Sequence, residues 1–196
     1  IDLDTAKELI NRSKENLIKA DAVILAADHV AKKFTDSPVW VLGSGAASDN
    51  LALHDRPSIT ELPATKLASK KAYQMANLSP QQIDFAEVHD CFTIAECLAT
   101  EDLGFTHKGD GGKFAREGLG IRNNGEICIN PSGGLKSKGH PLGATGTGQV
   151  VEVFKQLRGE VENTRQIRDA EYGLAHNVGG SGATCSVHIF GRNLRV

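Results

Sequence analysis

One glycine-rich stretch constrains the fold of this chain more than any other feature of its sequence. Residues 130–146 read Asn-Pro-Ser-Gly-Gly-Leu-Lys-Ser-Lys-Gly-His-Pro-Leu-Gly-Ala-Thr-Gly, so five glycines and two prolines surround one histidine, His140. Glycine allows positive φ and a close approach of backbone to ligand, and proline fixes the turns on either side. Imidazole has two distinct ring nitrogens and suits acid–base chemistry. A lone histidine in a turn more often only satisfies a buried carbonyl, so the interpretation of His140 depends on the rest of the chain.

The composition excludes several classes of protein. The 196 residues are 40% hydrophobic and include 21 glycines, which suits an α/β domain rich in turns. The net charge is −2 without basic clustering, which argues against nucleic-acid binding. No apolar run approaches the ~20 residues that a membrane span needs, and no signal-peptide pattern opens the chain. We therefore expect neither nucleic acid nor membrane as a partner.

The four cysteines are Cys91, Cys97, Cys128 and Cys185. They form no Cys-x-x-Cys pair, and the spacing of His and Cys fits no structural zinc site, so we expect no metal. Without a secretory segment, reduced thiols and a cytoplasmic location are expected. Residues 143–148 mimic a nucleotide-binding loop, but their spacing is not Gly-x-Gly-x-x-Gly and no acidic residue follows at the required distance.

Hydrophobic periodicity predicts alternating strands and helices along the chain. Expected helices begin near Asp4, cover residues 28–34, follow Pro63, run from Thr93 to Gly104 and end before Gly159. Expected strands cover residues 22–26, 39–42, 83–88, 127–129, 174–178 and 185–190, with turns at 43–45 and 179–182 and a long loop over 106–125. The alternation ends in a hairpin, which predicts an α/β layered fold. No linker divides the chain, so residues 1–196 are expected to form one domain.

Two further motifs change the interpretation of His140. Residues 87–92 read Glu-Val-His-Asp-Cys-Phe, and residues 176–182 read His-Asn-Val-Gly-Gly-Ser-Gly. Together with residues 130–146, which lie between them, they resemble the C-terminal half of a thiolase, of the acetyl-CoA acetyltransferase family. The three motifs follow one another in the same order as in that family. The likeness is to the archaeal thiolases and the thiolase part of sterol carrier protein X. It extends from about residue 22 to 191, with residues 1–21 weakly matched, and implies a βαβαβαββ layered domain.

The resemblance implies acyl-CoA chemistry, in which a carbon–carbon bond next to a thioester forms or breaks. Such chemistry needs a thiolate nucleophile, an acid/base beside the α-carbon and donors for developing oxyanions. His140 is then expected to activate the nucleophile and to donate to the thioester oxygen, through different ring nitrogens. Coenzyme A is part of the substrate, and no separate cofactor is implied.

His89 and Cys91 are the other two catalytic residues that the resemblance implies. His89 occupies the position where many thiolases have an Asn that holds a water in an oxyanion hole; the alternative is a histidine bonded locally at a strand end. The usual second cysteine, in a Cys-x-Gly motif, is replaced by Asn177-Val178-Gly179. The archaeal and sterol carrier protein X thiolases have a His-Asp-Cys-Phe motif, and its cysteine is thought to replace the missing one as the acid/base. The resemblance therefore implies that Cys91 is the acid/base; the alternative is that Cys91 is a small buried hydrophobic residue. The expected substrate and oxyanion contacts are Asn177, Gly179, Gly180, Gly139, Pro141 and Ser132.

The nucleophilic cysteine of a thiolase lies in its N-terminal half, which nothing in this chain resembles. The isolated chain is therefore expected to be inactive, and its expected partners are an acyl-CoA, an N-terminal thiolase half or subunit, a second copy of the chain and a small acyl-CoA-binding protein. Two alternatives stay open: a thiolase-fold aldolase or 3-hydroxy-3-methylglutaryl-CoA synthase relative, and a non-catalytic scaffold subunit that binds through an exposed apolar face.

Overall fold

The computed structural model describes residues 22–122 and 127–194. Its strands are β1 (Trp40–Ser48), β2 (Phe85–Glu87), β3 (Cys128–Ile129), β4 (Tyr172–Gly179) and β5 (Thr184–Gly191). Its helices are α2 (Asp28–Ala31), α3 (Pro63–Ala76), α4 (Thr93–Asp102), α5 (Gly111–Arg116), α6 (Gly134–Lys138) and α7 (Thr145–Arg158), with short 3₁₀ turns η1 (Leu53–Asp55) and η2 (Pro80–Gln82). With the short helices α2, α5 and α6 left aside, the order β1-α3-β2-α4-β3-α7-β4-β5 confirms the predicted βαβαβαββ arrangement.

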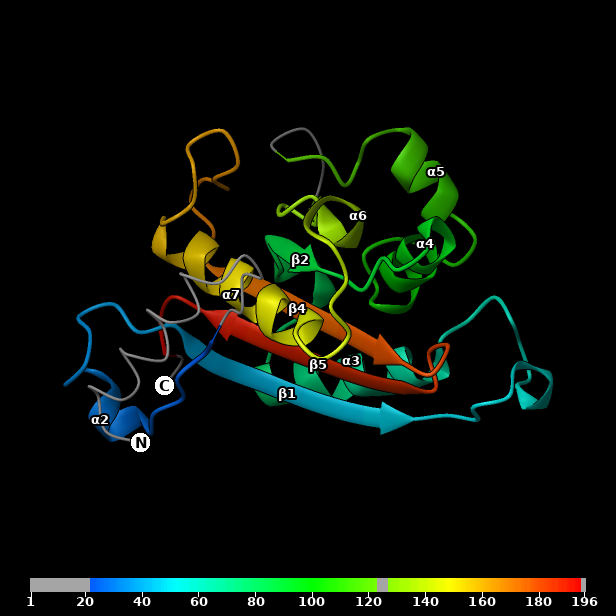
Figure 1. Ribbon diagram of the computed structural model, residues 1–196, viewed down its shortest axis with the longest axis horizontal. Helices are drawn as coiled ribbons and strands as arrows, with labels where there is room; N and C mark the ends of the chain where they lie inside the picture. The colour runs from blue at the N-terminus through cyan, green and yellow to red at the C-terminus, as the bar shows by residue number, and fades with distance from the viewer. Residues whose placement is uncertain (1–21, 123–126, 195–196) are drawn as a thin grey trace.

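The five strands form one mixed sheet in the order β1-β5-β4-β2-β3. β5 pairs antiparallel with β1 and β4, whereas β2 lies parallel to both β4 and β3. Helix α3 covers one face of the sheet and α7 lies on the other (Figure 1). Alternate residues of a strand point to opposite faces. Val187 and Ile189 accordingly join the core beneath α3, and Phe190 joins the core beneath α7.

Strand β1 corrects the prediction of a turn at residues 43–45. Gly43 and Gly45 lie inside the strand, and a Cβ on either one would collide with the backbone carbonyl of Ala72 or Ala68 in α3. These glycines allow α3 to pack closely on the sheet, and that requirement can be mistaken in sequence for turn chemistry.

Other expected elements change in length or are absent. Residues 22–26 are exposed coil, with Leu25 79% exposed, because no described strand pairs with them. The predicted helix over 28–34 shrinks to α2, and the predicted loop over 106–125 contains α5. Thr93 begins α4 after the N-cap Phe92, and the helix expected near Asp4 lies outside the described residues. None of the helices in the described ranges is long and apolar enough to cross a bilayer.

Candidate functional site

The three motifs meet where β2 and β4 end. β2 and β4 are parallel neighbours, and Glu87 pairs with Ala175. His89 and Asn177 each lie two residues beyond that pair, so the parallel register places them side by side. The third motif is the histidine loop, residues 130–146. Its last two residues begin α7, which packs on β4 and β2.

Two histidines form the centre of the site. The rings of His89 and His140 lie edge to face, with centroids 4.9 Å apart and an interplanar angle of 83°. His89 is buried whereas His140 is exposed. Burial lowers the pKa of His89, the neighbouring His140 lowers it further and Asp90 opposes them. His89 is therefore a neutral imidazole at neutral pH.

Thr145 fixes the orientation of His140. The Thr145 hydroxyl lies 2.7 Å from His140 Nδ1 and donates to the Pro141 carbonyl at 3.2 Å. Since the hydroxyl has only one proton, a neutral His140 donates through Nδ1–H and keeps an unprotonated Nε2. One ring nitrogen is thus occupied within the protein. This differs from the expectation that the two nitrogens serve separate catalytic roles, because the partner was not visible in the sequence.

Asn177 lies between His89 and helix α7. Its amide nitrogen is 3.1 Å from His89 Nδ1 and donates to Gln149 Oε1 at 2.9 Å. Gln149 is buried and donates to the His176 carbonyl at 2.9 Å. The structure therefore brings Asn177 into the site, but with its amide engaged by protein groups.

Cys91 lies two residues after His89 and is exposed. The alternative that it is a small buried hydrophobic residue is wrong. Burial raises the pKa of Cys128 to about 12 and of Cys185 to about 11, and Cys97 is half-buried with its pKa raised by burial and by nearby acidic side chains. Cys91 is thus the accessible thiol among the four cysteines, all of which the structure describes.

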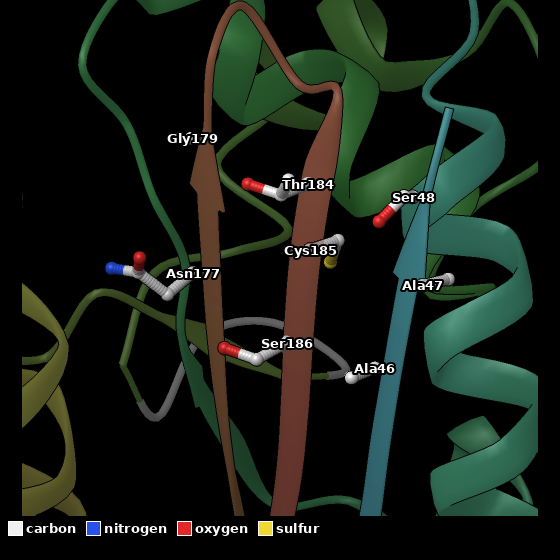
Figure 2. A pocket seen from close by; sticks show the side chains of 8 residues that line it. All are labelled: Ala46, Ala47, Ser48, Asn177, Gly179, Thr184, Cys185 and Ser186. Carbon is white, nitrogen blue, oxygen red and sulfur yellow. The ribbon is translucent and has the colours of Figure 1, made fainter. Parts of the chain in front are cut away.

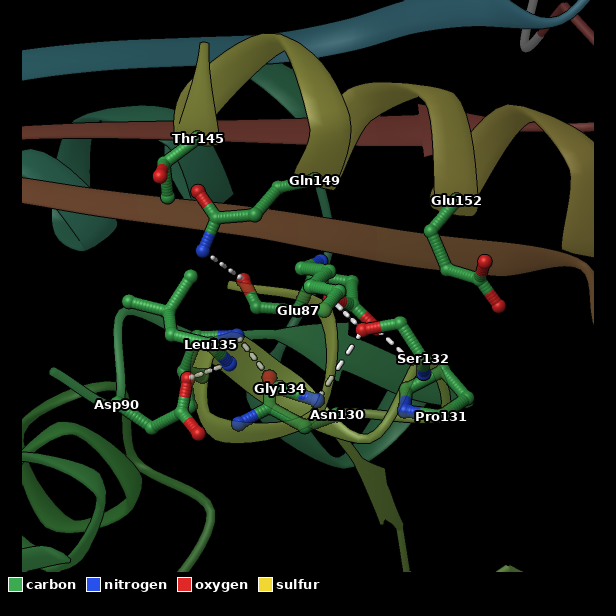
Figure 3. A network of polar contacts seen from close by, with 12 residues as sticks. Glu87, Asp90, Asn130, Pro131, Ser132, Gly134, Leu135, Thr145, Gln149 and Glu152 are labelled. Carbon is green, nitrogen blue, oxygen red and sulfur yellow. Dashed lines mark hydrogen bonds and ion pairs between the residues drawn. The ribbon is translucent and has the colours of Figure 1, made fainter. Parts of the chain in front are cut away.

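A buried carboxylate fastens the histidine loop to β2. Glu87 accepts hydrogen bonds from the Ser132 amide at 2.9 Å and the Ser132 hydroxyl at 2.7 Å (Figure 3). It also accepts one from Lys138 Nζ at 2.8 Å. The Glu87 side chain is 1% exposed. Burial raises its pKa, and Lys138 and Ser132 oppose the shift. The Ser132 hydroxyl, expected to contact substrate, is used here within the protein.

Two further contacts complete this attachment. Asp90 Oδ1 accepts from the Leu135 amide at 2.9 Å, and the Asn130 side chain accepts from the Val88 amide at 2.8 Å. Gly134, with φ +68°, lies so close to the Asp90 carboxylate that a Cβ would collide with it. The first half of the histidine loop is therefore fixed to the His-Asp-Cys-Phe motif by several hydrogen bonds and one close backbone approach.

The glycine turn after β4 borders a hollow of about 430 Å³. Gly180, Ser181 and Gly182 all have positive φ, and the Gly182 amide donates to Gly179 at 3.1 Å. The hollow is lined by Ala46, Ala47, Ser48, Asn177, Gly179, Thr184, Cys185 and Ser186 (Figure 2). Gly139 and Pro141, the two neighbours of His140 in the chain, are exposed.

His176 lies in the core below the site. It is fully buried; its Nδ1 accepts from the His89 amide at 3.4 Å and its Nε2 lies 2.9 Å from the Thr65 hydroxyl. Burial, with a smaller effect of His89, lowers its pKa to about 3. Both nitrogens are satisfied in a neutral ring, as the sequence suggested for a structural residue.

Sequence reasoning missed four residues that hold the site together: Glu87, Asp90, Thr145 and Gln149. Glu87 and Asp90 flank His89 in its motif, so carboxylates on both sides of a histidine were an available signal. Thr145 and Gln149 carried no such signal, because their role depends on where α7 begins. In the described ranges no group of three or more His, Cys, Asp or Glu gathers as metal ligands would.

Comparison with known proteins identifies the class to which this fold and site belong. Residues 45–192 match the family described as thiolase C-terminal domain-like, and the chain belongs to that family. It is 53% identical over 173 residues to an acetyl-CoA acetyltransferase of Methanothermobacter thermautotrophicus, and 46% identical over 175 residues to one of Methanocaldococcus jannaschii. These matches cover 88% and 87% of this chain and 45% of each relative, so the chain spans less than half the length of these proteins.

More distant relatives share part of this likeness. Bovine sterol carrier protein 2 is 40% identical over 169 residues, which cover 84% of this chain and 31% of the relative. The solved structure titled "Ltp2-ChsH2(DUF35) aldolase" superposes with a TM-score of 0.76 at 23% identity, over 86% of this chain and 43% of that chain. At this identity the superposition shows the fold alone.

The buried His176 generates a testable pH dependence. Its pKa is about 3 in the folded chain against an ordinary value of 6.5, so between these pH values only the unfolded chain binds the proton. Stability should therefore fall as the pH drops below about 6.5, by up to about 1.4 kcal/mol per pH unit from this residue. We expect His176→Asn to reduce that slope by about one proton in urea unfolding between about pH 4 and 6.5.

His54→Asn is the matched control, because the His54 side chain is 83% exposed. It should leave the slope unchanged. An unaltered slope in the His176 variant would contradict the buried neutral state.

Proposed function

We propose that this chain is the C-terminal half of a thiolase-type acyltransferase that acts on acyl-CoA thioesters by Claisen condensation or thiolytic cleavage. The observation that supports it most strongly is the contact between His89 and His140, with the accessible Cys91 two residues along from His89. The contact brings the proposed base, His140, next to the His89–Cys91 segment, which stands far from it in the sequence. The similarity to the archaeal acetyl-CoA acetyltransferases points to short substrates such as acetoacetyl-CoA.

We assign the roles from the atoms that remain available. His140 Nε2 takes the proton of the nucleophilic thiol, because its Nδ1 is held by Thr145. His89 donates through Nε2–H, directly or through a water, to the oxygen of the thioester. Gly179 and Gly180 contribute backbone amides at the end of β4, and Gly139 and Pro141 leave room for the pantetheine chain. Ser132 acts by holding the histidine loop.

Cys91 is the proposed acid/base for the α-carbon. In the cleavage direction the nucleophilic thiolate attacks the keto carbon of acetoacetyl-CoA, and the bond between the two acetyl units breaks. The Cys91 thiol then gives its proton to the α-carbon of the departing acetyl-CoA. Afterwards the Cys91 thiolate accepts the proton of an incoming CoA thiol, whose sulfur attacks the acetyl-enzyme and regenerates the nucleophile.

The acyl-carrying cysteine must come from outside this chain. Cys91 is assigned to proton transfer, and burial raises the pKa of the other three thiols, which suppresses their reactivity. The partner half is expected to pack on the same face of the sheet as α7, over β1 and β5, because α7 packs mainly on β4 and β2. Small side chains there border the hollow and permit close approach of a helix; they are Ala46, Ser48, Thr184 and Ser186.

Because the nucleophilic cysteine is assigned to the N-terminal half, the chain should be inactive alone and active when joined to that half. Alone, it should show no cleavage of acetoacetyl-CoA, and mass spectrometry after incubation with acetyl-CoA should find no acetyl adduct. Joined to the N-terminal half of the Methanothermobacter acetyl-CoA acetyltransferase, it should cleave acetoacetyl-CoA in a CoA-dependent way. His140→Ala should lower that activity by about 10²–10⁴. An acetyl group on Cys91 of the isolated chain, or normal turnover by the His140 variant, would show the assignment to be wrong.

A second prediction separates the two half-reactions. In the assembled enzyme Cys91→Ser should lower turnover by about 10²–10⁴, whereas formation of the acetyl-enzyme from acetyl-CoA should survive. Cys97→Ser is the control, because it makes the same change at a half-buried thiol in α4. It should retain nearly full turnover. Equal activity of the two variants would remove Cys91 from the mechanism.

A further inference from the structure

Two residues one turn apart on α7 reach the two histidines of the site, one directly and the other through Asn177. Thr145 and Gln149 are four residues apart and so lie on the same face of the helix. Thr145 contacts His140 directly, and Gln149 reaches His89 through Asn177. Both Thr145 and Gln149 are buried.

The direction of each hydrogen bond in the Gln149 chain follows from backbone carbonyls, which only accept. Gln149 Nε2 faces the His176 carbonyl at 2.9 Å. It also faces the Glu87 carbonyl at 3.5 Å (Figure 3). These two acceptors fix which end of the Gln149 amide is nitrogen. Its oxygen must then point to Asn177, and it accepts from Asn177 Nδ2 at 2.9 Å.

The same logic continues to His89. Because Gln149 holds the Asn177 nitrogen toward it, the second hydrogen of that nitrogen points to His89 Nδ1 at 3.1 Å. An amide nitrogen cannot accept, so His89 Nδ1 must be unprotonated and the ring proton must sit on Nε2. His140 has the reverse arrangement, with Nδ1–H donated to Thr145 and Nε2 free.

We propose that Gln149 is a positioning residue which, through Asn177, fixes the Nε2–H tautomer of His89 and so makes His89 a hydrogen-bond donor next to the His140 base. The two rings, whose centroids lie 4.9 Å apart, then differ in which nitrogen carries the proton. The catalytic meaning of the tautomer rests on the proposed function; the tautomer itself does not.

The tautomers are measured directly on the full chain, labelled with ¹⁵N-histidine, by long-range ¹H–¹⁵N NMR at neutral pH. In the wild-type chain we expect His89 to be protonated at Nε2 and His140 at Nδ1. Gln149→Met keeps the size of the side chain but removes the acceptor, so the Asn177 amide is released and His89 should acquire a population protonated at Nδ1. Asn177→Asp places only acceptors next to Nδ1 and should move the proton there fully.

Gln156→Met is the matched control for a merely structural effect. Gln156 lies on the same helix, is 1% exposed like Gln149 and makes several buried hydrogen bonds, but none to either histidine. It should lose stability and leave the His89 tautomer unchanged. Wild-type protonation at Nδ1, or an unchanged Nε2–H state in both Gln149→Met and Asn177→Asp, would overturn the proposal.

In the assembled enzyme Gln149→Met should lower kcat about tenfold or more, toward the 10²–10³ lost with an oxyanion donor, with little change in KM. Gln156→Met should retain kcat once folded. If the tautomer shifts as expected but even the wild-type assembly is inactive, the proposed function fails and the positioning role stands.

Discussion

The buried carboxylate of Glu87 is the contact on which the rest of the site depends. It lies at the end of β2 and accepts three hydrogen bonds from Ser132 and Lys138 of the histidine loop. Removing a carboxylate from water is costly, and only partners with good geometry offset that cost. Lys138, 26% exposed, keeps its charge near solvent while neutralising Glu87. A loop rich in glycine thereby gains one fixed position relative to the sheet.

The sheet and α7 convert this fixed loop into a site. The parallel pairing of β2 and β4 places His89 beside Asn177, and α7 crosses both strands with Thr145 and Gln149 facing them. His140 is thus held by Thr145 of α7, and His89 by Asn177 of β4. The polar side chains that contact the two rings, Thr145 and Asn177, come from α7 and β4, so the site is held by elements that pack independently of the substrate.

The order of the elements, and the motifs that carry His89, His140 and Asn177, could be predicted from the sequence because those features are local. Glycine spacing around His140 and alternation in β4 and β5 can be read from short windows. The errors came from tertiary contacts: Gly43 and Gly45 allow the close approach of α3, and residues 22–26 are apolar but pair with none of the strands that the structure describes. The roles of Thr145 and Gln149 likewise depend on packing that no local pattern shows.

The most direct test of this account is the contact between the His89 and His140 rings in a Glu87→Met variant, measured by NOEs between their ring protons. Met keeps a similar shape but accepts no hydrogen bonds from the loop. Asp102→Leu is the control, because Asp102 is also a buried carboxylate paired with a lysine, Lys108, away from the loop. The account predicts that Glu87→Met loses the ring NOEs while those of the β4–β5 hairpin persist, and that Asp102→Leu keeps both. Unchanged His89–His140 NOEs in Glu87→Met would contradict it.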